Sequence, residues 1–191
     1  MSSWAVVFGG PSPEHEISIL TGLQAERVLT GAGDSVTPIY WAPSGEWFLV
    51  PGATEAADYL NGVPKGAKPI EVRISHDSGL YVKRKALQFE AALLTLHGGV
   101  GEGGGAASVF SLLGIPATGS SLFAAAVGMD KLAFGGLMLA SGVPSSGSWL
   151  GDPLHQRDDH AGRDCCDERQ VCRIIDAISI RSVAPGQQRV T

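Results

Sequence analysis

The stretch AALLTLHGGVGEGGGAASVFSLLG, residues 91–114, contains an apolar run, a glycine-rich loop and an apolar periodic segment in that order. Residues 91–96 have the length and composition of a buried strand. Residues 98–105 are mostly glycine, and residues 106–114 have helical spacing and end at a glycine. The stretch therefore predicts one strand–loop–helix unit, the element from which α/β sheets are built.

The same arrangement occurs at the N-terminus. WAVVF (4–8) predicts a buried strand, GGPSPEHE (9–16) a loop, and ISILTGLQAERVL (17–29) a helix that stops at the glycines following it. Further segments complete the prediction, namely strands at 35–41, 46–50 and 79–84, a strand and turn at 115–121, and two helical stretches within 122–142. This succession predicts an α/β fold with a doubly wound, parallel, Rossmann-like sheet.

The composition of the 191 residues limits the classes of protein to consider. Hydrophobic residues make up 44% and charged residues 17%, so we expect a buried core rather than a disordered chain. A net charge of −5 argues against nucleic acid as the main partner. No apolar run approaches the ~18 residues of a membrane span, and the N-terminus lacks the pattern of a signal peptide. We therefore expect a cytoplasmic protein that binds no membrane.

The last 41 residues differ in composition from the rest. They contain six of the nine arginines but no lysine and no aromatic residue, and they hold all three cysteines, Cys165, Cys166 and Cys172. Three thiols with this spacing predict neither a disulfide framework nor a zinc site. We interpret the chain as an N-terminal lobe over 1–120, the start of a second domain over 121–149, and a poorly ordered tail over 150–191. The abrupt change suggests the hypothesis of a shifted reading frame or aberrant terminus after about residue 144.

Both glycine loops follow buried strands, where open α/β sheets bind ligands. Backbone N–H groups at a helix N-terminus attract anions, although glycines at such places often only make tight turns. Glu14 or Glu16, but not both, could point into this site and bind an ammonium group; acids also simply stabilise a first helical turn. His97 is either structural or a donor to a carboxylate or acyl phosphate.

A helix break near Gly128 precedes Met129-Asp130-Lys131. Asp130 has the residue type of an N-cap. Lys131 would then lie at the start of a new helix, either as a cation that meets a phosphate or as an ordinary solvated lysine.

Taken together and in order, five segments resemble the D-alanine–D-alanine ligases of the ATP-grasp superfamily. An ordered set of motifs is far more specific than one glycine loop. The segments are FGGPSPEHEIS (8–18), HGGVGEGGGAAS (97–108), GIPATGSS (114–121), AVGMDKLAF (126–134) and LASGVP (139–144).

The resemblance implies an activity and roles for particular residues. In this family ATP phosphorylates the carboxylate of one D-alanine, and the amine of a second D-alanine attacks the acyl phosphate, for peptidoglycan synthesis. By resemblance, Glu14 would hold the ammonium of the first D-alanine, His97 would lie near its carboxylate and acyl phosphate, and Lys131 would contact ATP phosphates. ATP, Mg²⁺ and a cytoplasmic homodimer are implied in the same way.

The sequence also departs from the family. Gly103 replaces the aspartate of the signature, so we expect a looser loop, and Gly135 occupies the place of a second lysine. After Pro144 nothing resembles the phosphate loop, the lysine-bearing strand or the acidic Mg²⁺ cluster. We therefore expect only the substrate lobe and the entrance to the ATP-grasp domain, with no metal site and no turnover by this chain alone.

Three alternatives remain open at this point. One is another ATP-grasp ligase, such as a D-alanine–D-lactate enzyme, and another is a non-catalytic domain that binds a small amino acid. A flavodoxin-like nucleotide binder is disfavoured, because both loops lack the G-x-G-x-x-G spacing and the first would turn carboxylates toward a phosphate.

Overall fold

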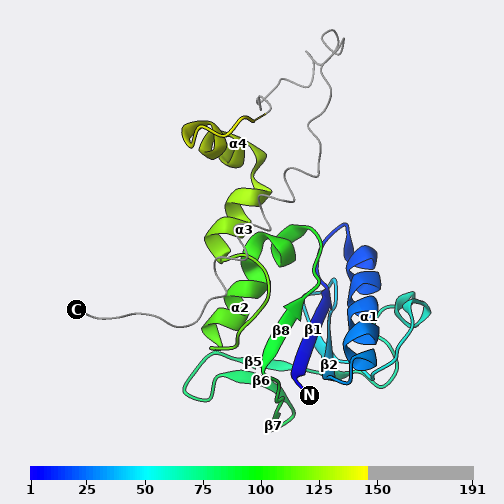
Figure 1. Ribbon diagram of the computed structural model, residues 1–191. Coiled ribbons are helices and arrows are strands. Elements are labelled where there is room, and N and C mark those ends of the chain that lie inside the picture. The colour runs from blue at the N-terminus through cyan, green and yellow to red at the C-terminus, as the bar shows by residue number, and fades with distance from the viewer. Residues whose placement is uncertain (146–191) are drawn as a thin grey trace. The chain divides into compact units, whose positions relative to one another are not determined.

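The computed structural model describes residues 1–145 and divides the chain into two units, Met1–Ala125 and a second that begins at Ala126. The predictions for the tail and its cysteines lie outside the described residues, and the domain boundaries inferred from the sequence stay predictions. Figure 1 shows the elements along the chain. The strands are β1 (Ser3–Gly9), β2 (Ser35–Trp41), β3 (Trp47–Leu49), β4 (Lys68–Pro69), β5 (Glu71–Arg73), β6 (Gly79–Val82), β7 (Lys85–Ala86) and β8 (Ala91–Leu94). The helices are α1 (His15–Gly31), α2 (Ala106–Leu112), α3 (Leu122–Met129) and α4 (Lys131–Ala140), with a 3-10 turn η1 (Ala56–Tyr59) and a π-helical turn η2 (Gly101–Gly105).

A five-stranded sheet of order β4-β3-β2-β1-β8 forms the centre of the first unit. β1 is parallel to both of its neighbours, with Val7 opposite Ile39 on one side and Leu94 on the other. The predicted α/β fold with a parallel core is therefore confirmed. β3 and β4 extend the sheet in antiparallel fashion. The strand predicted over 115–121 is reduced to one parallel bridge, between Ala92 and Ala117.

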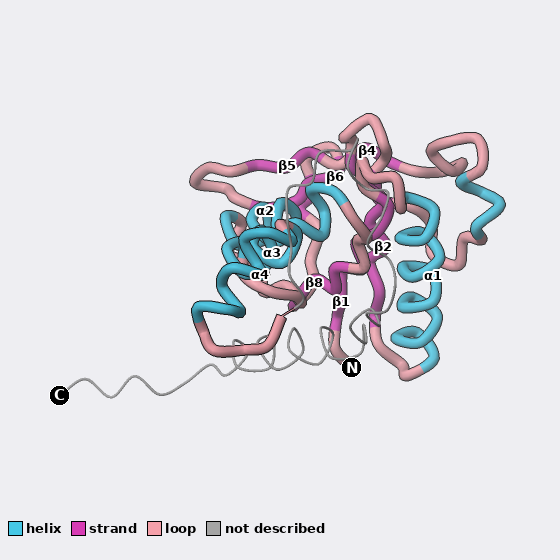
Figure 2. The backbone as a smooth tube through the Cα atoms, turned by 90° about the horizontal axis from the view of Figure 1, so that it is seen from above, coloured by secondary structure: helices cyan, strands magenta, loops and turns pink. Residues whose placement is uncertain are grey.

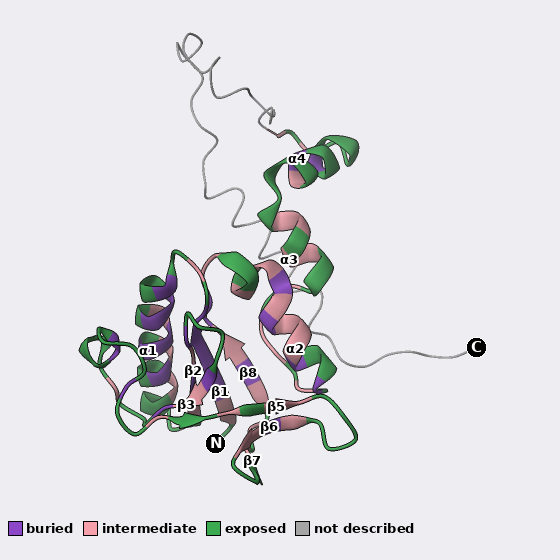
Figure 3. Cartoon of the chain, turned by 180° about the vertical axis from the view of Figure 1, so that it is seen from behind, coloured by how far each residue is buried: buried purple, intermediate pink, exposed green. Residues whose placement is uncertain are grey.

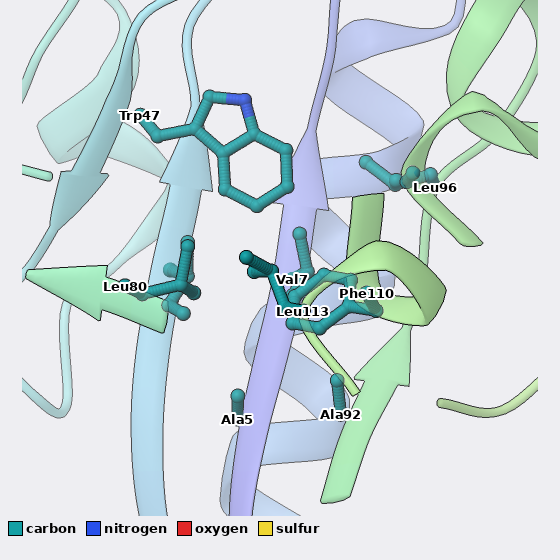
Figure 4. Packing of buried hydrophobic residues seen from close by; sticks show 10 residues of the cluster. Ala5, Val7, Trp47, Leu80, Ala92, Leu96, Phe110 and Leu113 are labelled. Atoms are coloured by element: carbon teal, nitrogen blue, oxygen red, sulfur yellow. The ribbon is translucent and has the colours of Figure 1, made fainter. Parts of the chain in front are cut away.

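Helices cover both faces of this sheet, as Figure 2 shows for α1 and α2. Alternate residues of β1 point to opposite faces. Val6 and Phe8 share a buried cluster with Leu23 of α1, whereas Val7 packs with Phe110 of α2 on the other face (Figure 4). The continuous apolar run of β1 thus follows from burial on two sides.

α1 packs closely against β1 through Gly22, a buried residue near its middle. A Cβ at this position would overlap with Cβ and Cγ of Phe8 and would lie 2.6 Å from its Cδ1. The face of α1 toward the sheet is buried and the opposite face is exposed (Figure 3). α1 begins two residues before the predicted start at 17 and ends at the predicted stop, Gly31.

A second, antiparallel sheet of order β5-β6-β7 is not hydrogen-bonded to the first. The strand predicted over 79–84 is present as β6 but belongs to this sheet and not to the parallel one. Its Leu80 is 1% exposed and joins the cluster of Phe110. The small sheet therefore covers part of the α2 side of the core.

Tyr59, at the end of η1, makes the stability of the fold depend on pH. Its side chain is 7% exposed, and its hydroxyl lies 2.9 Å from Oγ1 of Thr54. Burial raises the pKa of Tyr59 from 10.0 to about 12; the hydrogen bond with Thr54 opposes this rise, and the nearby charges, Glu26 foremost, add to it.

We expect the free energy of unfolding to fall as the pH rises from 10 to 12. In that range Tyr59 ionises in the unfolded chain but stays protonated in the folded one, so the loss totals about 2 kcal/mol. Urea unfolding between pH 9 and pH 11.5 measures it. Tyr59→Phe should show a shallower loss with pH, and an unchanged slope would contradict the assignment.

In the second unit, α4 begins as the sequence predicts. The carboxylate of Asp130 accepts hydrogen bonds from the backbone N–H groups of Leu132 and Ala133, both at 3.0 Å, so the predicted N-cap is confirmed. Among residues 1–145, no single helix has the length and apolar character to cross a membrane, and only the bent pair α3 and α4 satisfies those two criteria together.

Candidate functional site

The two glycine loops meet at the carboxyl edge of the parallel strands. β1 ends at Gly9 and its parallel neighbour β8 ends nearby, so the loops that follow emerge at the same edge. A Cβ on Gly98 would lie 2.6 Å from Oγ of Ser12, and one on Gly99 would lie 3.1 Å from the carbonyl oxygen of Pro11. Both glycines also have positive φ, 66° and 54°. This contact between the loops requires glycine and confirms that they share one edge of the sheet.

The structure brings Glu14 and His97 to this junction. Glu14 directly precedes α1, is exposed, and has its carboxyl carbon 3.5 Å from the place where a Cβ of Gly98 would stand. His97 is half-buried in the loop three residues beyond the end of β8, which is shorter than the predicted strand. A carboxylate and an imidazole thus lie on adjoining loops, a suitable arrangement for a small molecule with charges of both signs.

Lys131, the third predicted site residue, belongs to the second unit. It is the first residue of α4 and is exposed. Its contact with phosphate stays a prediction, as do the roles of Glu14 and His97.

His15 is a structural residue that the sequence analysis left without a role. Its Nδ1 lies 2.7 Å from the carbonyl oxygen of Gly10, and its Nε2 lies 3.0 Å from the hydroxyl of Tyr40. A carbonyl only accepts, so Nδ1–H donates to Gly10, and in the neutral imidazole Nε2 is then the acceptor for the Tyr40 hydroxyl. Burial raises the pKa of the Tyr40 hydroxyl, and the charge of Glu16 adds to this, which keeps the phenol protonated as a donor. His15 therefore connects the first glycine loop to β2 through these two hydrogen bonds.

Ser18 and Thr21 are two further polar residues that the sequence analysis missed. The Ser18 hydroxyl donates to the carbonyl of Thr95 at 2.8 Å and accepts from the N–H of Gly9 at 2.7 Å, which holds α1 against the end of β1 and the residue that follows β8. Thr21 contacts His97. Positions 14, 18 and 21 share one helix face, and this spacing of polar residues is the signal that could have found them.

The second loop is more closed than the sequence predicts. Glu102 accepts a hydrogen bond from the N–H of Gly98 at 2.7 Å, so one of the loop amides that could have bound an anion is paired with a carboxylate of the chain itself. Residues 101–105 form the π-helical turn η2 rather than an open loop, with Gly104 at φ 97°. A positive φ is easily reached by glycine, which allows the turn to run directly into α2.

No metal site is assembled by the described part of the chain. Within residues 1–145, no three side chains of the types His, Cys, Asp and Glu are grouped as a metal ion requires. The Mg²⁺ that the resemblance implies has no ligand set among these residues.

The family match and the related sequences agree on what this chain is similar to. Residues 3–120 match the family described as D-ala D-ala ligase N-terminus. The chain is 38% identical over 153 residues to the D-alanine–D-alanine ligase of Leptospira interrogans serovar copenhageni, covering 74% of this chain and 40% of that one. It is 33% identical over 165 residues to the ligase of Chlorobium chlorochromatii, covering 78% and 46%.

Solved structures show the same likeness. The VanG D-Ala:D-Ser ligase from Enterococcus faecalis superposes with a TM-score of 0.63 at 25% identity, over 92% of this chain and 49% of that one. The D-alanine–D-alanine ligase from Coxiella burnetii also gives a TM-score of 0.63 at 25% identity, over 75% and 43%. The chain spans less than half the length of each of these four proteins. Since the family match alone takes in more than half of its residues, the chain belongs to the D-alanine–D-alanine ligase family.

Proposed function

We propose that this chain supplies the amino-acid-binding lobe of an ATP-dependent ligase that joins two D-alanines for peptidoglycan synthesis. The observation that carries the proposal is the meeting of the two glycine loops, which sets Glu14 beside Gly98, the residue that follows His97 in the chain. In this proposal Glu14 binds the ammonium of the first D-alanine, because a carboxylate and an ammonium form strong charge-assisted hydrogen bonds. His97 lies toward the carboxylate that becomes the acyl phosphate.

The proposed reaction has two steps. The carboxylate of the first D-alanine attacks the γ-phosphate of ATP and releases ADP, and the amine of the second D-alanine then attacks the acyl carbon and releases phosphate. Lys131 is proposed to contact the phosphates of ATP as a cation. The cytoplasm as location and a homodimer as assembly belong to the same proposal.

The second substrate is a separate question. The structural neighbour from Enterococcus faecalis is, by its name, a D-Ala:D-Ser ligase. This likeness is compatible with a lobe that binds the first D-alanine while other parts select the second substrate, so a D-alanine–D-serine or D-alanine–D-lactate activity is an outcome that the assay must test.

Titration of the full chain with D-alanine tests the proposal. We expect binding of D-alanine, and we expect Glu14→Gln to weaken it by about tenfold or more, because the neutral amide loses the charge that attracts the ammonium. Glu16→Gln is the matched control, since Glu16 lies in the first turn of α1 and is exposed. Equal effects of the two substitutions, or no binding by the unaltered chain, would refute the role of Glu14.

A phosphate-release assay separates the enzyme from a binding domain. Mixed with ATP, Mg²⁺ and D-alanine, this chain alone is expected to release no phosphate, because its sequence lacks the family's phosphate loop and acidic cluster. Release that depends on both substrates would show that the chain is active by itself.

A further inference from the structure

Thr21 connects helix α1 to His97 at the glycine-loop junction. It lies two turns after Glu14 on the same helix face and is half-buried. Its Oγ1 is 3.0 Å from the carbonyl oxygen of Ile17 and 2.9 Å from Nε2 of His97. The second contact joins residues that are 76 positions apart in the chain.

The direction of these two hydrogen bonds follows from counting protons. A threonine hydroxyl has one proton, and the carbonyl of Ile17 can only accept, so the proton of Oγ1 goes to Ile17. Nε2 of His97 must then carry the hydrogen of the bond to Thr21. Among residues 1–145, no side chain or backbone group is hydrogen-bonded to Nδ1 of His97.

We propose that Thr21 is a positioning residue, which holds the His97 ring in the Nε2–H tautomer and leaves Nδ1 as the atom offered to the amino-acid ligand. The inference rests on the proposed function, in which His97 faces D-alanine. In this tautomer a neutral ring accepts a hydrogen bond at Nδ1, and it donates there to a carboxylate only after Nδ1 has gained a proton. Thr21 thereby determines both the orientation of the ring and the nitrogen that meets the ligand.

The tautomer can be observed directly in the full, ¹⁵N-labelled chain. Long-range ¹H–¹⁵N correlation spectra distinguish a protonated ring nitrogen from a bare one, and His97→Asn identifies the His97 signals by their loss. We expect Nε2–H in the unaltered chain and in Thr21→Ser, which keeps the hydroxyl. Thr21→Val keeps the shape of the side chain but removes the acceptor, so both tautomers should become populated.

Two results would overturn the proposal: protonation at Nδ1 in the unaltered chain, or the same Nε2–H pattern in Thr21→Val. The first needs no variant, so the test holds even if Thr21→Val does not fold.

The affinity for D-alanine is the second readout. Thr21→Val should weaken binding by about five- to tenfold, the effect of losing one hydrogen bond that orders a binding group, and Thr21→Ser should stay within about twofold. If the tautomer is as expected but D-alanine does not bind, the proposed function fails while the assignment to Thr21 stands. If D-alanine binds equally well to all three proteins, the positioning role is refuted and the proposed function survives.

Discussion

Gly22→Ala is expected to lower the free energy of unfolding by about 3 kcal/mol, through overpacking of a close helix–strand contact. In most helix interiors the same substitution is expected to stabilise the protein, because alanine is more favourable there than glycine by about 1 kcal/mol. The added Cβ would overlap with the side chain of Phe8. Phe8 is fully buried in β1, which is paired on both sides, so neither the ring nor its strand can withdraw cheaply.

Gly31→Ala is the matched control for this substitution. Gly31 is the last residue of the same helix, and a Cβ there would meet no atom within 4 Å. We expect it to stabilise the chain slightly or to have no effect, by at most about 1 kcal/mol. Urea unfolding followed by circular dichroism compares the two, and similar small changes in both variants would show that α1 does not approach β1 so closely.

Gly9→Ala is expected to destabilise the fold by about 4 kcal/mol, the sum of backbone strain and overpacking. Gly9 ends β1 with φ +92°, and its Cβ would overlap with the carbonyl oxygen of Trp41, which accepts the N–H of Gly10 at 2.7 Å. The same Cβ would lie 3.1 Å from Cε1 of His15, the residue that fastens this loop. We therefore expect D-alanine binding to be lost along with stability.

Gly33→Ala separates the cost of backbone strain from the cost of overpacking. Gly33 has nearly the same conformation, φ +90°, but nothing lies within 4 Å of the added Cβ. We expect Gly33→Ala to lower the free energy of unfolding by the backbone strain alone, about 1 kcal/mol. Equal losses in Gly9→Ala and Gly33→Ala, measured by the same unfolding experiment, would mean that the first loop yields to the extra atom without cost.

The parallel core was predictable because its signals are local. The apolar runs that became β1, β2 and β8 are short and bounded by turn residues, and α1 has helical spacing with a glycine stop. The antiparallel arrangement of β3 and the separate sheet of β6 were not predictable in this way. Strand runs of three and four residues do not specify a partner, and their pairing is set by contacts with the core, such as that of Leu80 with Phe110.

The position of Glu14 and His97 at the loop junction was predictable, whereas the contacts that support them were not, and their roles in binding stay predictions. Glu14 and His97 follow strands that were predicted to be parallel, so both loops were expected at one edge of the sheet. That the two strands are direct neighbours is shown by the structure and was not predicted. The bond between His15 and Tyr40 spans 25 positions, and that between Thr21 and His97 spans 76. No local pattern specifies such contacts, because they depend on how the helix is rotated against the sheet.

The pairing of β1 also has a consequence for how the chain folds in time. On one side β1 pairs with β2, where Ser3 lies opposite Ser35, and on the other side it pairs with β8, where Trp4 lies opposite Ala91. The second pairing can form only after residue 91 has been synthesised. As a nascent chain leaves the ribosome, its most apolar strand therefore keeps one edge open while some fifty residues that follow β2 are made, and an open apolar edge can pair with another chain. Such distant closure also slows folding. Because the two glycine loops touch only after β8 has docked, the site proposed for D-alanine is complete only from that point, and a folding intermediate made of β1, α1 and β2 alone would contain only the Glu14 side of it.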